Sequence, residues 1–196
     1  MSQFFETIAI LNGKPRNIAY HNRRLNSTVQ AYHETSELVD LEAALQTPKH
    51  VQSGLWKCKV IFDQSIRNII YEPYTLRQFN RFKLIVADDL EYQHKEVDRQ
   101  FLNSLYDQRG DCNDIIIVKN GLLTDTTIAN IAFYDGKVWL TPRHPLLSGT
   151  VRQRLLENSF LHKADITSSM IDSFKDFAIM NAMMEFLPIP NVLISQ

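Results

Sequence analysis

The sequence predicts an α+β protein, in which β-hairpins alternate with a few amphipathic helices. Apolar runs with the two-residue alternation of strands recur along the chain. Two of them end at Asn120-Gly121 and Asp135-Gly136, dipeptides that are the strongest short-range signal for a hairpin turn. Helical spacing of apolar residues is confined to a few short segments between these runs, and this mixture is typical of the α+β class.

The composition allows a buried core and excludes some kinds of partner. A chain of 196 residues with 44% hydrophobic residues can form one large domain or two small ones. Its net charge of -1 predicts no basic surface for nucleic acid or for an anionic membrane. Small molecules or a second copy of the chain are therefore the expected partners.

The cysteine content and the apolar segments predict a cytoplasmic protein. Cys58 and Cys112 are far apart and lack metal-ligand spacing, which is typical of a reducing compartment. The N-terminus has no basic region ahead of its short apolar run, and no run reaches about eighteen apolar residues. We therefore expect no membrane association.

The first 80 residues predict a small α+β domain. The alternation of apolar and polar residues predicts a hairpin with strands at 4–11 and 17–20 around a turn at 12–15. Apolar residues spaced by four and three predict a helix over 21–32, and a shorter amphipathic helix is expected over 34–45. Two further strands are expected at 55–62 and 66–71, before a polar linker at 73–82.

Arg23 and Arg24 are in the first turn of the predicted 21–32 helix, where cations are unfavourable. Both arginines could be solvated surface residues. Alternatively, one of them could bind a phosphate or a carboxylate together with the helix start.

Residues 81–196 predict a larger, β-rich C-terminal domain. The charged run at 88–99 is typical of a solvated loop, and a helix is expected over 98–106 with Phe101, Leu102 and Leu105 facing inward. Four strands are expected between 115 and 140, with a polar kink at 124–127, and a helix begins after Gly149. A buried apolar run at 177–184 and a short strand at 191–194 complete the domain.

Three positions in this domain could carry chemistry, although each also has a structural explanation. Thr150 and Gln153 have the spacing of a capping box, and the same helix start could bind an anion because Gly149 allows close approach. Asp125 could be an ordinary turn residue or a carboxylate directed into a cleft. Lys95, taken alone, would be a solvent-exposed lysine. No nucleophile elbow, dinucleotide-binding glycine pattern or P-loop occurs.

Four blocks of sequence together resemble the class IV aminotransferase and aminodeoxychorismate lyase family. They occur in the family's order as FFETIAILNGKPRNIAYHNRRL, YQHKEVDRQFLNSL, VKNGLLTDTTIANIAFYDGKVWLTPRHPLLSGTVRQRLL and IMNAMMEFLPI. The resemblance covers nearly the whole chain and is most specific in the third block. It implies a fold type IV enzyme with two small α/β domains and pyridoxal 5'-phosphate held between them, here shortened at the N-terminus.

The resemblance also implies roles for particular residues. Lys95, in HKEVDR, falls where the family has the lysine that forms the internal aldimine, and Arg24 falls at the family's phosphate-binding arginine. Asp125 falls where the family usually has a glutamate that pairs with the pyridine nitrogen. The phosphate cradle falls at Gly149, Thr150 and Val151, and a loop that closes over the phosphate side falls at Asn181 and Ala182.

These roles agree with the needs of the cofactor, which are an anion clamp, a carboxylate for the ring nitrogen and a lysine amine. The resemblance implies a lyase that converts 4-amino-4-deoxychorismate to 4-aminobenzoate and pyruvate on the folate pathway, and that works as a homodimer. Two alternatives stay open. One is a class IV aminotransferase acting on D-amino or branched-chain amino acids, and the other is a non-catalytic homologue that only binds the cofactor.

Overall fold

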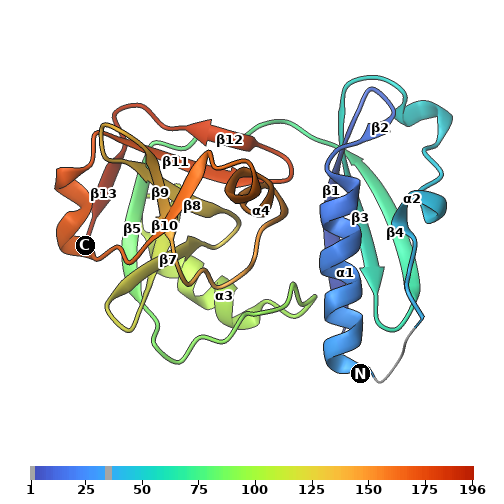
Figure 1. Cartoon of the computed structure of the whole chain (residues 1–196), viewed down its shortest axis with the longest axis horizontal. Coiled ribbons are helices and arrows are strands. Elements are labelled where there is room, and N and C mark those ends of the chain that lie inside the picture. The colour runs from blue at the N-terminus through green and yellow to red at the C-terminus, as the bar shows by residue number, and fades with distance from the viewer. Residues whose placement is uncertain (1–2, 34–36) are drawn as a thin grey trace. The chain divides into compact units, whose positions relative to one another are not determined.

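The computed structural model describes residues 3–33 and 37–196, and the chain divides into two compact units. Unit 1 contains Met1–Leu76 and His94–Asp98, and unit 2 contains Arg77–Gln93 and Arg99–Gln196. A single boundary near residue 80 does not describe this division, because residues 94–98 return to the first unit. Figure 1 shows the elements of both units, coloured along the chain.

Unit 1 is a four-stranded antiparallel sheet with one long helix against it. The strands have the order β2-β1-β3-β4. Their bounds are β1 Phe4–Leu11, β2 Lys14–Pro15, β3 Leu55–Phe62 and β4 Ile66–Pro73, and the helices are α1 Ile18–Tyr32 and α2 Leu41–Ala44. Helix α1 runs along one face of the sheet (Figure 1).

The core of unit 1 lies between α1 and this face of the sheet. Alternate residues of β1, Phe4, Ile8 and Ile10, are buried with Leu25 and Val29 of α1. Because side chains alternate between the faces of a strand, every second residue of β1 points toward the helix. The expected strands at 4–11, 55–62 and 66–71 are confirmed.

The first hairpin and the first helix of unit 1 differ in detail from the expectation. The return strand of the first hairpin is only Lys14–Pro15, because Asn17 adopts a left-handed conformation at φ 53° and α1 starts at Ile18. Arg24 is therefore in the second turn of α1, where the dipole effect of the helix end has largely decayed.

The helix expected over 34–45 is also shorter than predicted. Residues 34–36 lie outside the described part of the chain, and only Leu41–Ala44 is helical among the others. Asp40 begins this turn because its Oδ1 accepts hydrogen bonds from the backbone N–H groups of Glu42 and Ala43.

Unit 2 contains a nine-stranded mixed sheet. Its main path has the order β10-β9-β8-β7-β6-β5-β13, and β11 pairs with both β8 and β12. The bounds are β5 Arg81–Val86, β6 Asp114–Lys119, β7 Leu122–Thr126, β8 Asn130–Tyr134, β9 Trp139–Pro142, β10 Leu161–Ala164, β11 Asp176–Asn181, β12 Glu185–Pro188 and β13 Leu193–Ser195. The helices are α3 Gln100–Tyr106 and α4 Thr150–Glu157.

The sheet of unit 2 curves around its own core. Phe82 of β5 and Phe177 of β11 come from distant parts of the sheet, yet their ring centroids are 5.2 Å apart. Ile116, Ile131 and Ile179 are buried in the same cluster. The strand residues that alternate with these core residues therefore point outward, and helices α3 and α4 cover them.

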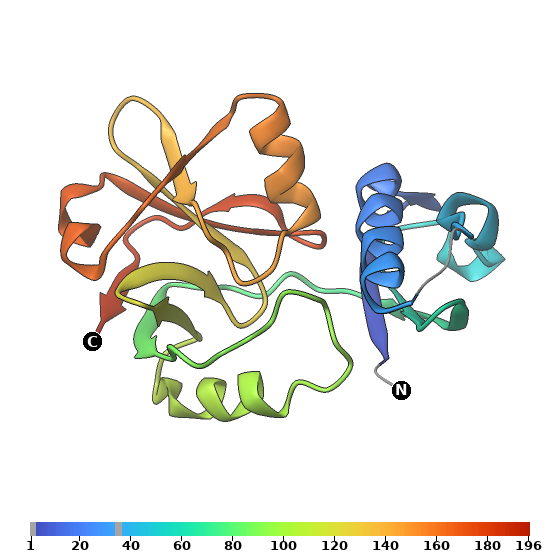
Figure 2. The same ribbon diagram turned by 60° about the horizontal axis from the view of Figure 1, so that its bottom comes forward.

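Helices α3 and α4 cover different parts of this curved sheet, as Figure 2 shows. Leu102 and Leu105 of α3 pack with Ile115 and Ile117 of β6. Val151 and Leu155 of α4 pack with the outward residues of β8 and β11, Ala132 and Met180. These contacts fix the start of α4 beside the strands that carry the polar residues of the unit.

Two expectations for unit 2 need correction. Phe101 is 50% exposed, so only Leu102 and Leu105 of α3 face inward. Strand β7 continues through Asp125 to Thr126, and the kink is a turn in which the N–H of Thr126 bonds to the carbonyl of Ala129. Across the described ranges, no helix has the length and apolar character needed to cross a membrane.

Candidate functional site

The residues singled out from the sequence fall in both units. Lys95 and Arg24 belong to unit 1. The others belong to unit 2 and are Asp125, Gly149, Thr150, Val151, Asn181 and Ala182.

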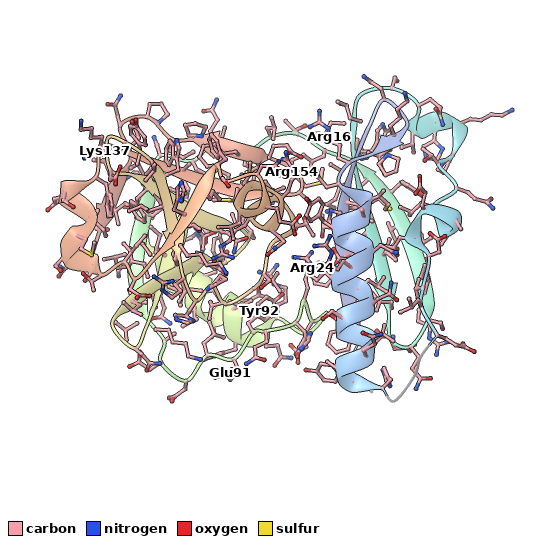
Figure 3. The ribbon with its side chains drawn as sticks, in the orientation of Figure 1. Arg16, Arg24, Glu91, Tyr92, Lys137 and Arg154 are labelled. Atoms are coloured by element: carbon pink, nitrogen blue, oxygen red, sulfur yellow. The ribbon has the colours of Figure 1, made fainter. Side chains whose placement is uncertain are left out.

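In unit 1, Arg24 forms a bidentate ion pair with Glu6, a residue of β1 that is 1% exposed. Its Nε lies 2.7 Å from Oε1 of Glu6, and its Nη2 lies 2.6 Å from Oε2. The Nδ1 atom of His21, a fully buried residue one turn earlier in α1, lies 2.7 Å from the same Oε2. Figure 3 shows Arg24 extending from α1.

The surroundings of Glu6 keep it ionised. Burial alone would raise the pKa of Glu6, but the charge of Arg24 and the hydrogen bonds from Arg24 and His21 outweigh this effect and lower the pKa to about 2. The buried carboxylate therefore orients the guanidinium and compensates its charge. An acidic residue on the otherwise apolar face of β1 is the sequence signal that could have revealed Glu6.

Lys95 is fixed through its backbone to β1. The carbonyl of Lys95 accepts a hydrogen bond of 2.8 Å from the N–H of Phe5, and the N–H of Val97 donates to the carbonyl of Gln3, also over 2.8 Å. The Nζ atom of Lys95 lies 4.6 Å from the centre of the Phe5 ring, and the Nζ atom of Lys59 lies 4.7 Å from it. A residue of the charged loop is thus held on the sheet by pairing and by a cation–π contact.

In unit 2, Asp125 is 4% exposed, and both of its carboxylate oxygens accept hydrogen bonds. Oδ1 lies 2.7 Å from Nδ2 of Asn130, and Oδ2 lies 2.9 Å from the backbone nitrogen of Leu147. Asp125 and Asn130 also face each other in the β7–β8 register, on either side of the turn. Asp125 is therefore a buried carboxylate beside the turn, and it also accepts from the backbone, as a turn residue would.

The charge of Asp125 is less well compensated than that of Glu6. Burial raises its pKa, and the hydrogen bonds from Leu147 and Asn130 and the charge of Arg152 only partly oppose this, so that the pKa is about 6. A cation placed against this carboxylate would favour its ionised form.

The start of α4 differs from the predicted capping box. Gly149, and not Thr150, is the N-cap residue, and it provides no side-chain hydrogen bond to the first turn. A Cβ atom at Gly149 would lie 1.9 Å from Oδ1 of Asn130, so the neighbouring amide requires glycine here. Val151 is 1% exposed and belongs to the core below α4, which leaves its backbone rather than its side chain as the group able to meet an anion.

Asn181 stabilises the turn between β11 and β12. Its Oδ1 accepts from the N–H groups of Met183 and Met184, and its Nδ2 donates to the carbonyl of Ile128. Ala182 lies inside this turn and is partly buried. The contacts of Asn181 thus explain the turn without a ligand.

The same turn is also joined to α4. Glu185, which has a φ of 57°, forms an ion pair with Arg154. Arg154 is labelled in Figure 3. The turn is thereby held beside the helix whose start contacts Asn130.

Arg152 is a further polar residue that the sequence did not reveal. It is 3% exposed and donates to Oγ1 of Thr141 over 3.2 Å and to the carbonyl of Pro142 over 2.7 Å. Desolvation lowers its pKa, and the negative charge of Asp125 opposes that shift. An arginine in the first turn of a helix has no local signal for burial, since such residues are usually exposed.

The two groups of residues provide distinct chemical functions. Unit 1 offers an oriented guanidinium and a lysine amine, and unit 2 offers a buried carboxylate and the N-terminus of a helix. The carboxylate and the helix start of unit 2 suit an organic anion that also carries a cationic nitrogen. Within the described ranges, no group of three or more His, Cys, Asp or Glu side chains could hold a metal ion.

Several known proteins are similar to this chain. The family model for amino-transferase class IV matches residues 3–192. An uncharacterised protein of Haemophilus influenzae is 36% identical over 185 residues, which cover 93% of this chain and 98% of that protein.

Two solved structures are also similar. A candidate 4-amino-4-deoxychorismate lyase of Haemophilus somnus has a TM-score of 0.84 and 29% identity, over 93% of this chain and 97% of that one. The pyridoxal phosphate-bound form of a hypothetical aminotransferase of Mycobacterium tuberculosis has a TM-score of 0.76 and 14% identity, over 98% and 81% of the two chains, and it shows the shared fold.

The fold is therefore the fold type IV arrangement expected from the sequence, and the family consists of pyridoxal phosphate-dependent lyases and aminotransferases. Since the family model matches nearly the whole sequence, this chain belongs to the class IV aminotransferase family.

Proposed function

We propose that the protein is a pyridoxal phosphate-dependent lyase that converts 4-amino-4-deoxychorismate to 4-aminobenzoate and pyruvate. The observation that carries this proposal is the similarity to the Haemophilus somnus protein along nearly the full length of both chains. The same proposal includes a role on the folate pathway and a cytoplasmic homodimer as the active form.

The residues present fit the proposed cofactor. Asp125 is a buried carboxylate whose two oxygens are already oriented by Asn130 and Leu147, which suits a protonated ring nitrogen. The eight-residue helix α4 begins at a glycine that provides no side-chain cap, which suits a phosphate group. Arg24 adds a guanidinium that is held in one orientation by Glu6.

When bound, pyridoxal phosphate supplies an electron sink for the negative charge that develops beside the substrate's amino group. In this proposal the amine of Lys95 is the catalytic group that binds the cofactor and then moves a proton to or from the substrate. Its backbone pairing with β1 would keep the start of the Lys95 side chain in place during both steps. Asp125 holds its negative charge at the ring nitrogen, and Arg24 binds the phosphate.

A class IV aminotransferase acting on D-amino or branched-chain amino acids is the second candidate, favoured by the family model. The same residues would serve both reactions, because both need the electron sink and a lysine that moves protons. The difference is in the product. The lyase releases pyruvate from one substrate, and the aminotransferase passes the amino group to a keto acid.

The product distinguishes the two reactions. Purified protein loaded with pyridoxal phosphate should release 4-aminobenzoate from aminodeoxychorismate, and the Lys95→Ala variant should release none. The assay measures the fluorescence of the 4-aminobenzoate that is formed. Transfer of an amino group from D-alanine or leucine to 2-oxoglutarate, without formation of 4-aminobenzoate, would contradict the lyase and support the aminotransferase.

A second experiment tests the assignment of Lys95 without relying on turnover. Borohydride reduction of the loaded protein, followed by peptide mass mapping, should place the phosphopyridoxyl label on Lys95. A label on another lysine would refute the assignment. A protein that carries the label but forms neither product would instead be the non-catalytic homologue.

A further inference from the structure

Asn130 joins two parts of the proposed site in unit 2. It is 6% exposed, and its Nδ2 donates to Oδ1 of Asp125 over 2.7 Å and to the carbonyl of Leu147 over 2.9 Å. The N–H of Leu147 in turn donates to Oδ2 of Asp125 over 2.9 Å. These three hydrogen bonds form a closed ring that links β7, β8 and the loop before α4.

The other side of the same amide faces the helix start. Oδ1 of Asn130 occupies the space beside Gly149. A Cβ atom added at Gly149 would lie only 1.9 Å from this Oδ1 atom. One side chain therefore contacts both the carboxylate of Asp125 and the N-cap residue of α4.

We propose that Asn130 is a positioning residue that holds the Asp125 carboxylate in register with the start of α4. The inference rests on the proposed function, in which these two groups bind the ring nitrogen and the phosphate of one cofactor. The ring nitrogen and the phosphate of a rigid aromatic ligand are separated by a nearly fixed distance. The Asp125 carboxylate and the start of α4 must therefore keep a matching distance from each other.

Asn130 also acts on the charge of Asp125. Its N–H bond is one of the interactions that oppose the effect of burial on the pKa of Asp125. Removing the amide should therefore change the pH dependence of cofactor binding as well as its strength. A buried asparagine that served only to satisfy the loop backbone would have no effect on that pH dependence.

The experiment compares Asn130→Ala with a matched control, Thr124→Val. Thr124 is 4% exposed and donates a buried side-chain hydrogen bond of 2.8 Å to the carbonyl of Ile117. It precedes Asp125 in β7, so that its side chain points to the other face of the strand. The control therefore removes a bond of the same kind without touching the ring of hydrogen bonds around Asp125.

Binding is measured for two probes, pyridoxal phosphate and inorganic phosphate, by equilibrium dialysis between pH 5 and pH 8.5. Asn130→Ala should lower the affinity for pyridoxal phosphate by about tenfold or more and the affinity for inorganic phosphate by about threefold or less. The reason is that only pyridoxal phosphate needs the Asp125 carboxylate and the start of α4 in register. Asn130→Ala should also move the midpoint of the pH dependence of pyridoxal phosphate binding upward, by about half a unit or more. Thr124→Val should change neither the affinity ratio nor the midpoint.

The outcomes separate the inference from the proposed function. If the unaltered protein binds no pyridoxal phosphate, both are overturned. If the unaltered protein binds it, and Asn130→Ala gives the same affinity ratio and midpoint, only the positioning role is overturned. Should Asn130→Ala not fold, Asn130→Ser, which keeps one donor in the cluster, is measured in the same way and should give a smaller shift in the same direction.

Discussion

Replacing Asp125 by Asn tests a buried carboxylate whose pKa is raised. Asp125 is 4% exposed, and its pKa is about 6, compared with an ordinary value of 3.8. The cause is burial, which the N–H groups of Leu147 and Asn130 and the charge of Arg152 only partly offset. The substitution removes the titrating group and keeps the shape of the side chain.

The magnitude follows from the difference between the two pKa values. A rise from 3.8 to about 6 corresponds to about 3 kcal/mol of unfolding free energy, at about 1.4 kcal/mol per unit. Because the pKa is higher in the folded state, the folded state binds the proton more tightly. This contribution to stability is complete below pH 4 and is lost as the pH rises through 6.

The assay is urea unfolding of the cofactor-free protein and of Asp125→Asn at intervals from pH 4 to pH 8. In the variant, the new side-chain NH2 at position 125 faces a donor, either Nδ2 of Asn130 or the N–H of Leu147. This contact lowers the unfolding free energy by about 1–3 kcal/mol at every pH. Buried Asp114, whose pKa is also raised by burial, contributes equally to both proteins and cancels in the difference. The stability of the variant relative to the unaltered protein should therefore improve by about 2.4 kcal/mol between pH 4 and pH 8. A difference that stays constant across this range would refute the buried, proton-binding carboxylate.

Three further changes test other parts of the structure. Glu6→Gln should destabilise the protein by about 3–5 kcal/mol at pH 7, because it leaves the charge of Arg24 without its carboxylate. Since the pKa of Glu6 is lowered to about 2, the loss of stability measured by urea unfolding should stay the same from pH 7 down to pH 5. Gly149→Ala should lower stability by about 1–3 kcal/mol, because its Cβ would displace Asn130, and a thermal melt that matches the unaltered protein would contradict the close contact. Phe177→Ala should cost about 3–5 kcal/mol by opening a cavity in the core of unit 2, and urea unfolding would show an equal loss with and without pyridoxal phosphate.

The hairpins could be predicted from the sequence because their signals are local. Asn120 and Gly121 both have positive φ values, 50° and 78°, as the expected turn between β6 and β7 requires. The alternation along β1 and β3 gave their bounds because one face of that sheet is apolar and buried. A period-two pattern and a turn dipeptide need no knowledge of distant residues.

The errors arose where the decisive contact is distant in sequence. Phe101 was expected to face inward with Leu102 and Leu105, but α3 packs on β6 through the two leucines and leaves Phe101 50% exposed. The start of α1 depended on the left-handed Asn17, a conformation that propensity alone does not predict. Gly149 and not Thr150 is the N-cap residue, with an extended backbone at φ -68° and ψ 142°, and Asn130 occupies the space that a side chain at this position would need.

The candidate site was only partly predictable for the same reason. The family resemblance singled out Lys95 and Asp125, but Glu6 and Asn130 act through partners from other elements of the fold. Glu6 and Arg24 are 18 residues apart and meet only when α1 packs on β1. The partners that determine the charge of each buried group are thus products of the fold.

The contrast between Glu6 and Asp125 indicates what unit 2 still requires. Both carboxylates are almost fully buried, yet the pKa of one is about 2 and that of the other is about 6. Glu6 has a bidentate guanidinium and an imidazole within 2.7 Å, whereas Asp125 has one amide at 2.7 Å and one backbone N–H at 2.9 Å. A buried carboxylate compensated mainly by neutral donors gains the most from a cationic ligand, because the ligand supplies the missing charge in a site that is already desolvated. A protonated pyridine nitrogen is such a ligand, and the pKa of Asp125 should then fall when the cofactor binds.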